Sequence, residues 1–418
     1  MNRNKRTNAL PCVARTGESI ADLYHRSAAV VDLACISHNL QIVRKKAPGR
    51  MIIAMVKANA YGHGLVRIAE HLASEGVDYL GTAFVEEALE LRKAGIAIPI
   101  ITSGPFSKFQ IGLFIENNID LTIASVDALQ YIREAAEFYK KRVNIHLKID
   151  TGMMRIGIRH SNAHKLFAAA LEGEKYLNLV SIFSHFANAD NDDLDFAYLQ
   201  LERFLESTRF FNNEHRPSPL LQMANSAAIL KMEESWLDMV RPGIMLYGYH
   251  PSASSEPKAD LLPALSLRAK IMYFKVVLAG SSVGYGRTWT ASRNSRVVTI
   301  PVGYGDGYAR GLSNKGYVLL RGTRYPVVGN VCMDQTMIAI GDGEAYIGEE
   351  VQLMGRQGEE AITADELADL LGTINYEILT NISARVPRIY INENQSQRPP
   401  TPRSLPKKNL LQGTLEQR

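Results

Sequence analysis

Cysteine is scarce in this chain of 418 residues, which holds only Cys12, Cys35 and Cys332. A set this small and scattered excludes a disulfide framework and favours a reducing compartment. Long apolar runs are missing too, since no stretch reaches the roughly 18–20 uninterrupted apolar residues of a membrane span. The basic, polar start MNRNKRTNALPCVARTGES also lacks the apolar run of a signal peptide. We therefore expect a cytoplasmic protein with no membrane partner.

The body of the chain also lacks an excess of charge of either sign. The total is +4, and residues 1–20 and 393–418 each carry +3, which leaves about −2 for the residues between them. A nucleic-acid surface requires a basic patch on the folded domain, so we expect no nucleic-acid partner. Walker loops and dinucleotide fingerprints are missing as well, because the glycine-rich GYGDG at 303–307 is not followed by a helical pattern.

Short apolar runs alternate with amphipathic helical patterns from residue 51 to about 250. Near-continuous apolar strands suit a parallel sheet that is buried on both faces and connected by helical crossovers. Eight such strands predict an α/β fold with a closed (β/α)8 TIM barrel, and an open doubly wound sheet remains the alternative. The expected strands are 51–58, 79–84, 98–102, 121–125, 143–150, 179–186, 220–226 and 239–248, and the helices include 64–76, 85–95, 125–140 and 193–211.

After about residue 262 the pattern changes to strands separated by glycine-containing turns. Only TADELADLLG (363–372) is typical of a helix there, so this part predicts a second, mostly β domain. The proline-rich, polar end of the chain predicts a disordered basic tail. The expected divisions are an N-terminal extension at 1–27, the barrel at 28–262, the β domain at 263–392 and the tail at 393–418.

Chemically useful side chains follow the predicted barrel strands. Catalytic groups of such barrels lie at the C-terminal ends of the strands, and these ends carry Lys57, Lys148, His185, Ser226 and Arg241. Lys57 ends an apolar strand, where burial lowers the pKa of an amine as Schiff-base chemistry requires. When Lys57 is considered without its neighbours, the more common interpretation is a lysine whose side chain extends from the barrel rim into water.

Eight motifs in fixed order favour the chemical interpretation. They are VKANAYGHG (56–64), KIDTGMMRIG (148–157), SHFANAD (184–190), NSAA (225–228), RPGIMLYG (241–248), VGYGRTW (283–289), PVGYGDGYAR (301–310) and GNVCMDQ (329–335). Together they resemble the alanine racemase family over roughly residues 28–392. The resemblance implies a fold-type III pyridoxal-phosphate enzyme with a barrel, a C-terminal β domain that pairs with 28–33, and a head-to-tail homodimer. It also implies two-base interconversion of L- and D-alanine, which supplies D-alanine for peptidoglycan.

The resemblance assigns the residues that bind the cofactor. Lys57 would bind pyridoxal 5'-phosphate as a Schiff base and then act as one proton-transfer base. The phosphate would be held by Tyr61, Ser226 and the backbone N–H groups of Gly243 and Ile244, since a dianion suits such a nest of donors. The other interpretation of Ser226 is an N-cap of the following helix, and both roles can hold at once.

Arg241 would face the pyridine nitrogen, with His185 against the cofactor ring and Asn225 also among the cofactor-binding residues. An arginine keeps its proton, so it leaves that nitrogen unprotonated and makes the cofactor a weaker electron sink. A less stabilised carbanion favours plain racemisation over transamination. An ion pair at the barrel mouth is the alternative for Arg241, and a satisfied core histidine is the alternative for His185.

Racemisation needs a base on each face of a planar intermediate, and Tyr285 resembles the second base of the family. It would enter the active site of the partner subunit. Arg155 would contact this phenol and the substrate carboxylate, and its positive charge would favour the phenolate. The resemblance also assigns carboxylate binding to the backbone N–H of Met333. Lys148 matches a lysine that is carbamylated in some members of the family. Tyr304 and Arg310 resemble entry-corridor residues, and Asp334 would have a supporting role.

One position departs from the family pattern. In NISARVPR (381–388), many alanine racemases carry a tyrosine where this chain has Ala384. Loss of that phenol predicts a wider pocket, so a broad-specificity racemase that accepts serine, lysine and other amino acids is the first alternative. A fold-type III decarboxylase and a single-barrel cofactor carrier are further alternatives. His160 and His164 could share a helix face, but no acid completes a zinc signature, and we expect no metal.

Overall fold

The computed structural model describes residues 25–214, 218–252 and 259–392, which fall into two compact units. The larger unit contains 30–266, 362–383 and 388–392, and the smaller contains 25–29, 267–361 and 384–387. Three segments of the expected β domain, 263–266, 362–383 and 388–392, therefore group with the barrel. The predicted tail and residues 1–24 of the predicted extension lie outside the described residues. Within the described ranges, no helix is long and apolar enough to cross a membrane.

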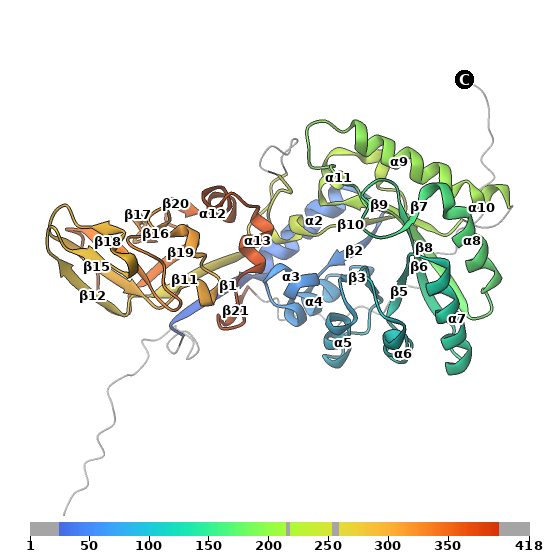
Figure 1. Ribbon diagram of the computed structural model, residues 1–418, viewed down its shortest axis with the longest axis horizontal. Coiled ribbons are helices and arrows are strands. Elements are labelled where there is room, and N and C mark those ends of the chain that lie inside the picture. Colours follow the sequence, from blue (N-terminus) through green and yellow to red (C-terminus); the bar gives the residue numbers. More distant parts are fainter. Residues whose placement is uncertain (1–24, 215–217, 253–258, 393–418) are drawn as a thin grey trace, which may run out of the picture. The chain divides into compact units, whose positions relative to one another are not determined.

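Eight parallel strands form a closed barrel in the larger unit (Figure 1). They are β2 (Met51–Met55), β3 (Tyr79–Thr82), β4 (Ile100–Thr102), β5 (Asp120–Ile123), β6 (Val143–Asp150), β8 (Leu177–Phe183), β9 (Leu220–Asn225) and β10 (Met239–Arg241). β10 returns to β2 through Met239 and Met51, and β5 pairs with β6 through Leu121 and Ile145. The predicted (β/α)8 barrel is therefore confirmed, and the open doubly wound sheet is excluded. The short β7 (Ile158–Arg159) pairs only with the end of β6.

Helices follow the barrel strands where the sequence shows apolar residues at helical spacing. In α7 (Val126–Tyr139), Ser125 accepts a hydrogen bond from the N–H of Ala128 as N-cap, and Leu129, Ile132 and Ala136 form the buried face. The others are α2 (Leu33–Lys46), α3 (Lys57–Tyr61), α4 (Leu65–Ser74), α5 (Val85–Lys93), α6 (Ile111–Glu116), α8 (Ala163–Glu172), α9 (Asp195–Thr208), α10 (Phe210–Asn213) and α11 (Ser226–Lys231), with short 3-10 turns η1 (Lys108–Gln110), η2 (His160–Asn162) and η3 (Glu233–Ser235).

The strand expected at 239–248 is much shorter than predicted. It ends at Arg241, and Ile244–Tyr247 forms the 3-10 turn η4. Pro242 has no N–H to continue the ladder, and Gly243 lies outside the strand conformation with φ −118° and ψ −99°. The prediction of a strand after Gly243 is therefore wrong, because a buried turn and a buried strand can have the same apolar composition.

The smaller unit is mostly β structure, as predicted. One sheet has the order β17-β16-β19-β11-β1, and β12, β15 and β18 form a second sheet. Val277, Val283, Val297 and Val328 belong to its apolar core. The strands that lie wholly or partly in this unit are β1 (Ser27–Asp32), β11 (Leu265–Lys270), β12 (Tyr273–Val277), β13 (Ser282–Val283), β14 (Trp289–Thr290), β15 (Ser295–Ile300), β16 (Tyr317–Leu320), β17 (Thr323–Pro326), β18 (Thr336–Gly341), β19 (Glu350–Gln357) and β20 (Glu360–Ile362), with 3-10 turns η5 (Tyr285–Arg287), η6 (Tyr304–Asp306) and η7 (Arg310–Leu312).

The C-terminal part of the described chain contains one more helix than predicted. The expected helix is α12 (Ala364–Leu371), and α13 (Asn375–Thr380) follows it. Only Asn375 and Leu379 of α13 are buried, so its six residues show too little periodicity to be found from the sequence. The last described strand, β21 (Arg388–Ile391), lies in the larger unit, where Arg388 donates to the carbonyl of Gly62.

Candidate active site

The C-terminal ends of the barrel strands bring a group of cations together. Lys57 begins α3, one residue beyond the end of β2, Lys148 lies near the end of β6, and Arg241 ends β10. Nζ of Lys148 lies 4.6 Å from the ring centre of Phe183, and Cζ of Arg241 lies 5.2 Å from the same ring. An Nη2 of Arg241 also lies 3.4 Å from Nδ1 of His185. The strand-end residues expected from the sequence therefore do converge.

The chain makes a strained turn immediately after Lys57. Ala58, Asn59, Ala60 and Tyr61 all have left-handed backbone conformations, with φ between 52° and 55°. This conformation costs about 1–2 kcal/mol for each residue with a side chain. Hydrogen bonds hold the turn, since the carboxylate of Glu87 accepts from Ala58 N–H and the side chain of Asn59 accepts from the N–H of Leu65. Strain of this kind, fixed by its surroundings, is typical of functional sites.

Gly62, which follows this turn, provides a test of the packing that holds it. A Cβ on Gly62 would lie 2.1 Å from the carbonyl oxygen of Leu379, and its φ is +84°. We expect Gly62→Ala to lower the free energy of unfolding by about 3 kcal/mol in urea titrations, because both strain and overlap arise. Gly49→Ala is the matched control, with φ +73° and no atom within 4 Å, and it should cost only about 1 kcal/mol. Equal costs would show that close packing at Gly62 is unimportant.

Three residues of the expected phosphate site converge beside this turn. Oγ of Ser226 accepts hydrogen bonds from the N–H groups of Gly243 (2.9 Å) and Met245 (3.5 Å). A Cβ on Gly243 would lie 2.4 Å from the hydroxyl of Tyr61, so the phenol reaches this backbone. The ring of Tyr61 stacks on Tyr247 with the ring centres 4.7 Å apart.

The roles of the residues around Ser226 differ in one respect from the sequence analysis. Asn225, not Ser226, is the N-cap of α11, and its side chain accepts from the N–H of Ala228 at 3.0 Å. The alternative N-cap role of Ser226 is therefore wrong. Ile244 begins η4 and is fully buried.

Burial lowers the pKa of Lys57, Lys148 and Arg241 at the barrel mouth, and neighbouring positive charges lower the pKa of the two lysines further. Burial and then Arg155 and Arg241 lower the pKa of Lys57, although Glu87 acts in the opposite direction. Burial, followed by the charges of Arg241, Arg155 and Lys57, lowers the pKa of Lys148 to about 7. Burial lowers the pKa of Arg241 to about 9. A cluster of this kind favours anionic ligands, which would relieve the repulsion.

His185 lies beside these cations and is uncharged at neutral pH. Its pKa falls well below the usual histidine value because of burial and then the charges of Arg241 and Lys148. A neutral imidazole ring can pack against a flat ligand without adding to the positive charge of the site. This environment differs from that of a satisfied core histidine, which was the alternative.

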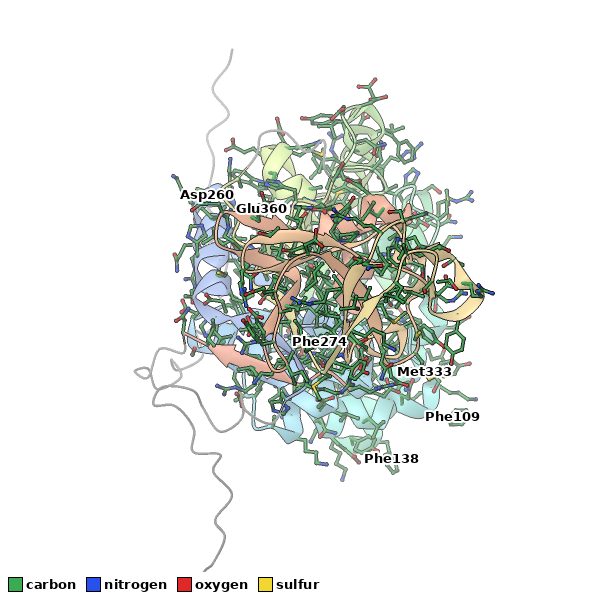
Figure 2. All side chains as sticks on the ribbon, turned by 90° about the vertical axis from the view of Figure 1, so that its left-hand side faces the viewer. Phe109, Phe138, Asp260, Phe274, Met333 and Glu360 are labelled. Carbon is green, nitrogen blue, oxygen red and sulfur yellow. The ribbon has the colours of Figure 1, made fainter. Side chains whose placement is uncertain are left out.

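The remaining candidates belong to the smaller unit. Tyr285 lies in η5 with 75% of its surface exposed, and its carbonyl accepts from the side chain of Asn330. The carbonyl of Met333 accepts from the N–H of Gly305. Tyr304 and Arg310 are exposed at the starts of η6 and η7, and the carboxylate of Asp334 pairs with Arg385 at 2.7 Å. Phe274 and Met333, labelled in Figure 2, are also exposed.

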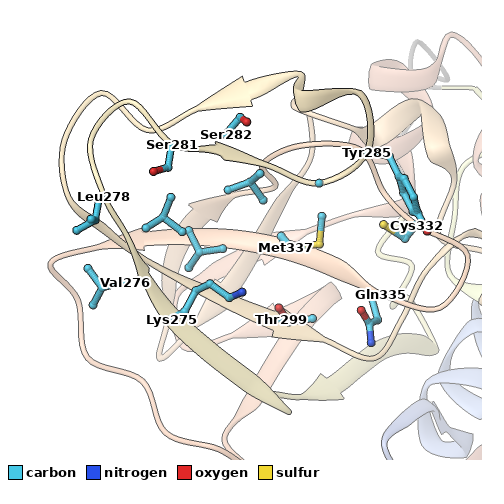
Figure 3. A pocket seen from close by; sticks show the side chains of 14 residues that line it. Lys275, Val276, Leu278, Ser281, Ser282, Tyr285, Thr299, Cys332, Gln335 and Met337 are labelled. Atoms are coloured by element: carbon cyan, nitrogen blue, oxygen red, sulfur yellow. The ribbon is translucent and has the colours of Figure 1, made fainter.

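Tyr285 also lines a pocket of the smaller unit with a volume of about 700 Å³. Figure 3 shows Tyr285 beside Cys332 at one end of the pocket and Leu278 at the other. Val276 and Leu278 on its lining are more than half exposed. The candidate base therefore lies beside exposed apolar side chains.

Sequence reasoning missed several buried residues of the barrel. Asp120, His146, Ser181 and Gln222 are at most 5% exposed and hydrogen-bond to one another below the cation cluster. The signal in the sequence that could reveal them is a polar residue within an apolar strand. In the described part of the chain, no group of three or more His, Cys, Asp or Glu side chains could hold a metal ion.

Comparison with known proteins relates most of the chain to one family. Residues 31–251 match the family model of the alanine racemase N-terminal domain, and residues 264–390 match that of the alanine racemase C-terminal domain. The chain is 43% identical to the alanine racemase of Carboxydothermus hydrogenoformans over 365 residues, which cover 87% of this chain and 99% of that protein. It is 40% identical to the alanine racemase of Cutibacterium acnes over 370 residues, which cover 88% and 98%.

Solved structures give the same result. The alanine racemase of Clostridium difficile 630 superimposes with a TM-score of 0.83 at 35% identity, covering 88% of this chain and 96% of that one. A histidine racemase from Leuconostoc mesenteroides superimposes with a TM-score of 0.82 at 28% identity, covering 88% and 99%. The same fold therefore occurs in a racemase named for a larger amino acid.

Proposed function

Since this chain belongs to the alanine racemase family of isomerases, we propose that it interconverts L- and D-alanine with pyridoxal 5'-phosphate as its cofactor. The observation that carries this proposal is the half-buried amine of Lys57, whose pKa is lowered inside a cluster of cations at the end of a barrel strand. A neutral amine is the form that attacks an aldehyde. The decarboxylase alternative is not favoured, because both matching family models are those of alanine racemase.

The residues of the barrel mouth fit this cofactor. The Tyr61 hydroxyl, Oγ of Ser226 and the backbone at Gly243 and Ile244 would hold the phosphate, where the surrounding positive charge favours a dianion. Arg241 would face the ring nitrogen, and its pKa of about 9 keeps it a donor at neutral pH. When bound, pyridoxal phosphate supplies the electron withdrawal that acidifies the α C–H bond of an amino acid.

The residues of the chain itself then move and hold protons. Nζ of Lys57 takes or gives a proton on one face of the α-carbon, and Oη of Tyr285 does the same on the other face. The guanidinium of Arg155 binds the substrate carboxylate, and the backbone N–H of Met333 assists it. Racemisation follows because a proton leaves one face and another returns to the opposite face.

We infer that Tyr285 acts in the active site of a second copy of the chain. Its phenol is 75% exposed, whereas a proton-transfer group works in a site that excludes water. Tyr273, Val276 and Leu278 nearby in the smaller unit are also more than half exposed. A homodimer would cover this apolar surface and complete both sites together.

Lys148 fits the carbamylated state that the family resemblance implies. Its pKa of about 7 leaves a large neutral fraction, and only a neutral amine reacts with carbon dioxide. A carbamate would replace one positive charge of the cluster with a negative charge that can orient Arg155. The proposed cell-wall role and cytoplasmic location rest on the family activity and the scarcity of cysteine.

The substrate assay tests the function and its breadth together. We expect purified protein supplied with pyridoxal phosphate to racemise alanine, measured as D-alanine from L-alanine by chiral chromatography. Ala384 is exposed and small, so we also expect measurable turnover of serine and lysine. Ala384→Tyr should reduce kcat/KM for lysine at least about tenfold relative to alanine, because a pocket that loses volume rejects longer side chains. Lack of alanine racemisation contradicts the function, and strict alanine preference in the unaltered chain contradicts the wider range.

A further inference from the structure

Five neighbouring barrel strands each contribute a buried polar side chain to one continuous chain of hydrogen bonds. β10 carries Arg241, β9 Gln222, β8 Ser181, β6 His146 and β5 Asp120. Each is at most 6% exposed, although branched apolar residues usually fill the interior of such barrels. We name these five residues the polar relay. Side chains alternate along a strand, so His146 faces the same side of β6 as Lys148, and Ser181 faces the same side of β8 as Phe183.

The hydrogen bonds of the polar relay all run in one direction. An Nη1 N–H of Arg241 donates to Oε1 of Gln222 (2.9 Å), and Nε2 of Gln222 donates to Oγ of Ser181 (2.7 Å). Asp120 as a carboxylate can only accept, so Nε2 of His146 donates to it (3.1 Å). Nδ1 of His146 then accepts from the hydroxyl of Ser181 (2.6 Å). Four hydrogen bonds therefore connect a permanent cation to a carboxylate.

Gln222 also determines which donors of Arg241 remain for a ligand. The two N–H groups on Nη2 donate to the carbonyls of Ser184 (2.6 Å) and Met223 (3.1 Å). A guanidinium has five N–H groups in a fixed plane. One Nη1 N–H donates to Gln222. Among the described residues, the Nε–H and the second Nη1 N–H of Arg241 therefore remain free to donate to a ligand. Without the hydrogen bond to Gln222, the Nη1 group of Arg241 could rotate away from its present orientation.

We propose that Gln222, Ser181, His146 and Asp120 are positioning residues for Arg241, and this rests on the proposed cofactor site. They fix the plane of the guanidinium, and the negative charge of Asp120 polarises the four hydrogen bonds toward itself. The polarised guanidinium is a weaker donor at its remaining N–H groups. The polar relay thus keeps electron withdrawal by the cofactor ring low, which suits racemisation rather than competing chemistry.

Two substitutions that change the charge of the polar relay in opposite ways can distinguish a positioning role from a merely structural one. Asp120→Asn keeps the shape but removes the distant negative charge, and Gln222→Glu places a negative charge directly against Arg241. We expect the absorption maximum of the bound cofactor to move in opposite directions in these two variants. Gln222→Leu should raise the cofactor Kd about tenfold by removing a charged hydrogen bond. Ser235→Ala is the control, since Ser235 is equally buried but bonds only to the nearby carbonyl of Met232.

A crystal structure of the cofactor-free Gln222→Leu variant completes the test. We expect the Nη1 group of Arg241 to be displaced relative to its position in the unaltered chain. An unmoved guanidinium, or shifts of the same sign in Asp120→Asn and Gln222→Glu, would overturn the proposal. Failure of the unaltered chain to bind pyridoxal phosphate would instead contradict the proposed function. If Gln222→Leu does not fold, the comparison of Asp120→Asn with Gln222→Glu decides the question by the same spectral criterion.

Discussion

Replacing Lys57 with alanine should lower racemisation at least about 1,000-fold and abolish the absorbance band of covalently bound cofactor. The change removes both the amine that joins the cofactor and the base on one face of the α-carbon. It also removes a positive charge from a cluster in which Arg155 and Arg241 already repel Lys57. The fold should therefore remain stable, and thermal unfolding should occur at or above the temperature found for the unaltered chain.

Lys165→Ala provides the control for this prediction. Lys165 is an exposed residue of α8, so its removal should change neither the absorbance nor the rate. Both variants should be measured by a cofactor spectrum and by deuterium incorporation at the α-carbon of alanine. A Lys57→Ala protein that keeps the absorbance band would place the covalent link on another lysine, and the role of Lys57 would be wrong.

The barrel and the main cations of the site could be predicted because they follow local rules. Lys57 lies just beyond the end of an apolar strand and Arg241 ends another, and parallel barrels collect such ends at one mouth. The motif around Lys57 added the chemistry. Neither inference needed knowledge of which strands are neighbours.

The polar relay could not be predicted from local rules. Asp120 and Arg241 lie on β5 and β10, and their connection exists only because the closed barrel places β6, β8 and β9 between them. The left-handed turn at Ala58–Tyr61 has the same origin. Alanine favours ordinary helices, so contacts such as that of Glu87 with Ala58, and not composition, set the turn.

Tyr285→Phe is expected to reduce racemisation about 100- to 10,000-fold while leaving the fold and cofactor absorbance intact. The change removes one hydroxyl from an exposed ring, so no core packing is lost. With one base remaining, Lys57 should still exchange the α-proton of one enantiomer of alanine with solvent deuterium. The other enantiomer should lose exchange, because its proton faces the missing phenol. Equal loss of exchange from both enantiomers would contradict the role of Tyr285 as the second base.

Mixing two inactive variants tests whether Tyr285 acts across subunits. A dimer of one Lys57→Ala chain and one Tyr285→Phe chain has one site with both bases intact only if each site takes its tyrosine from the partner. If each site used its own chain, both sites of the mixed dimer would lack a base. Random exchange of subunits at equal amounts should therefore restore about one quarter of the unaltered activity. Because each variant alone stays inactive, recovered activity can come only from a shared site, and lack of recovery in verified mixed dimers would assign Tyr285 to its own chain.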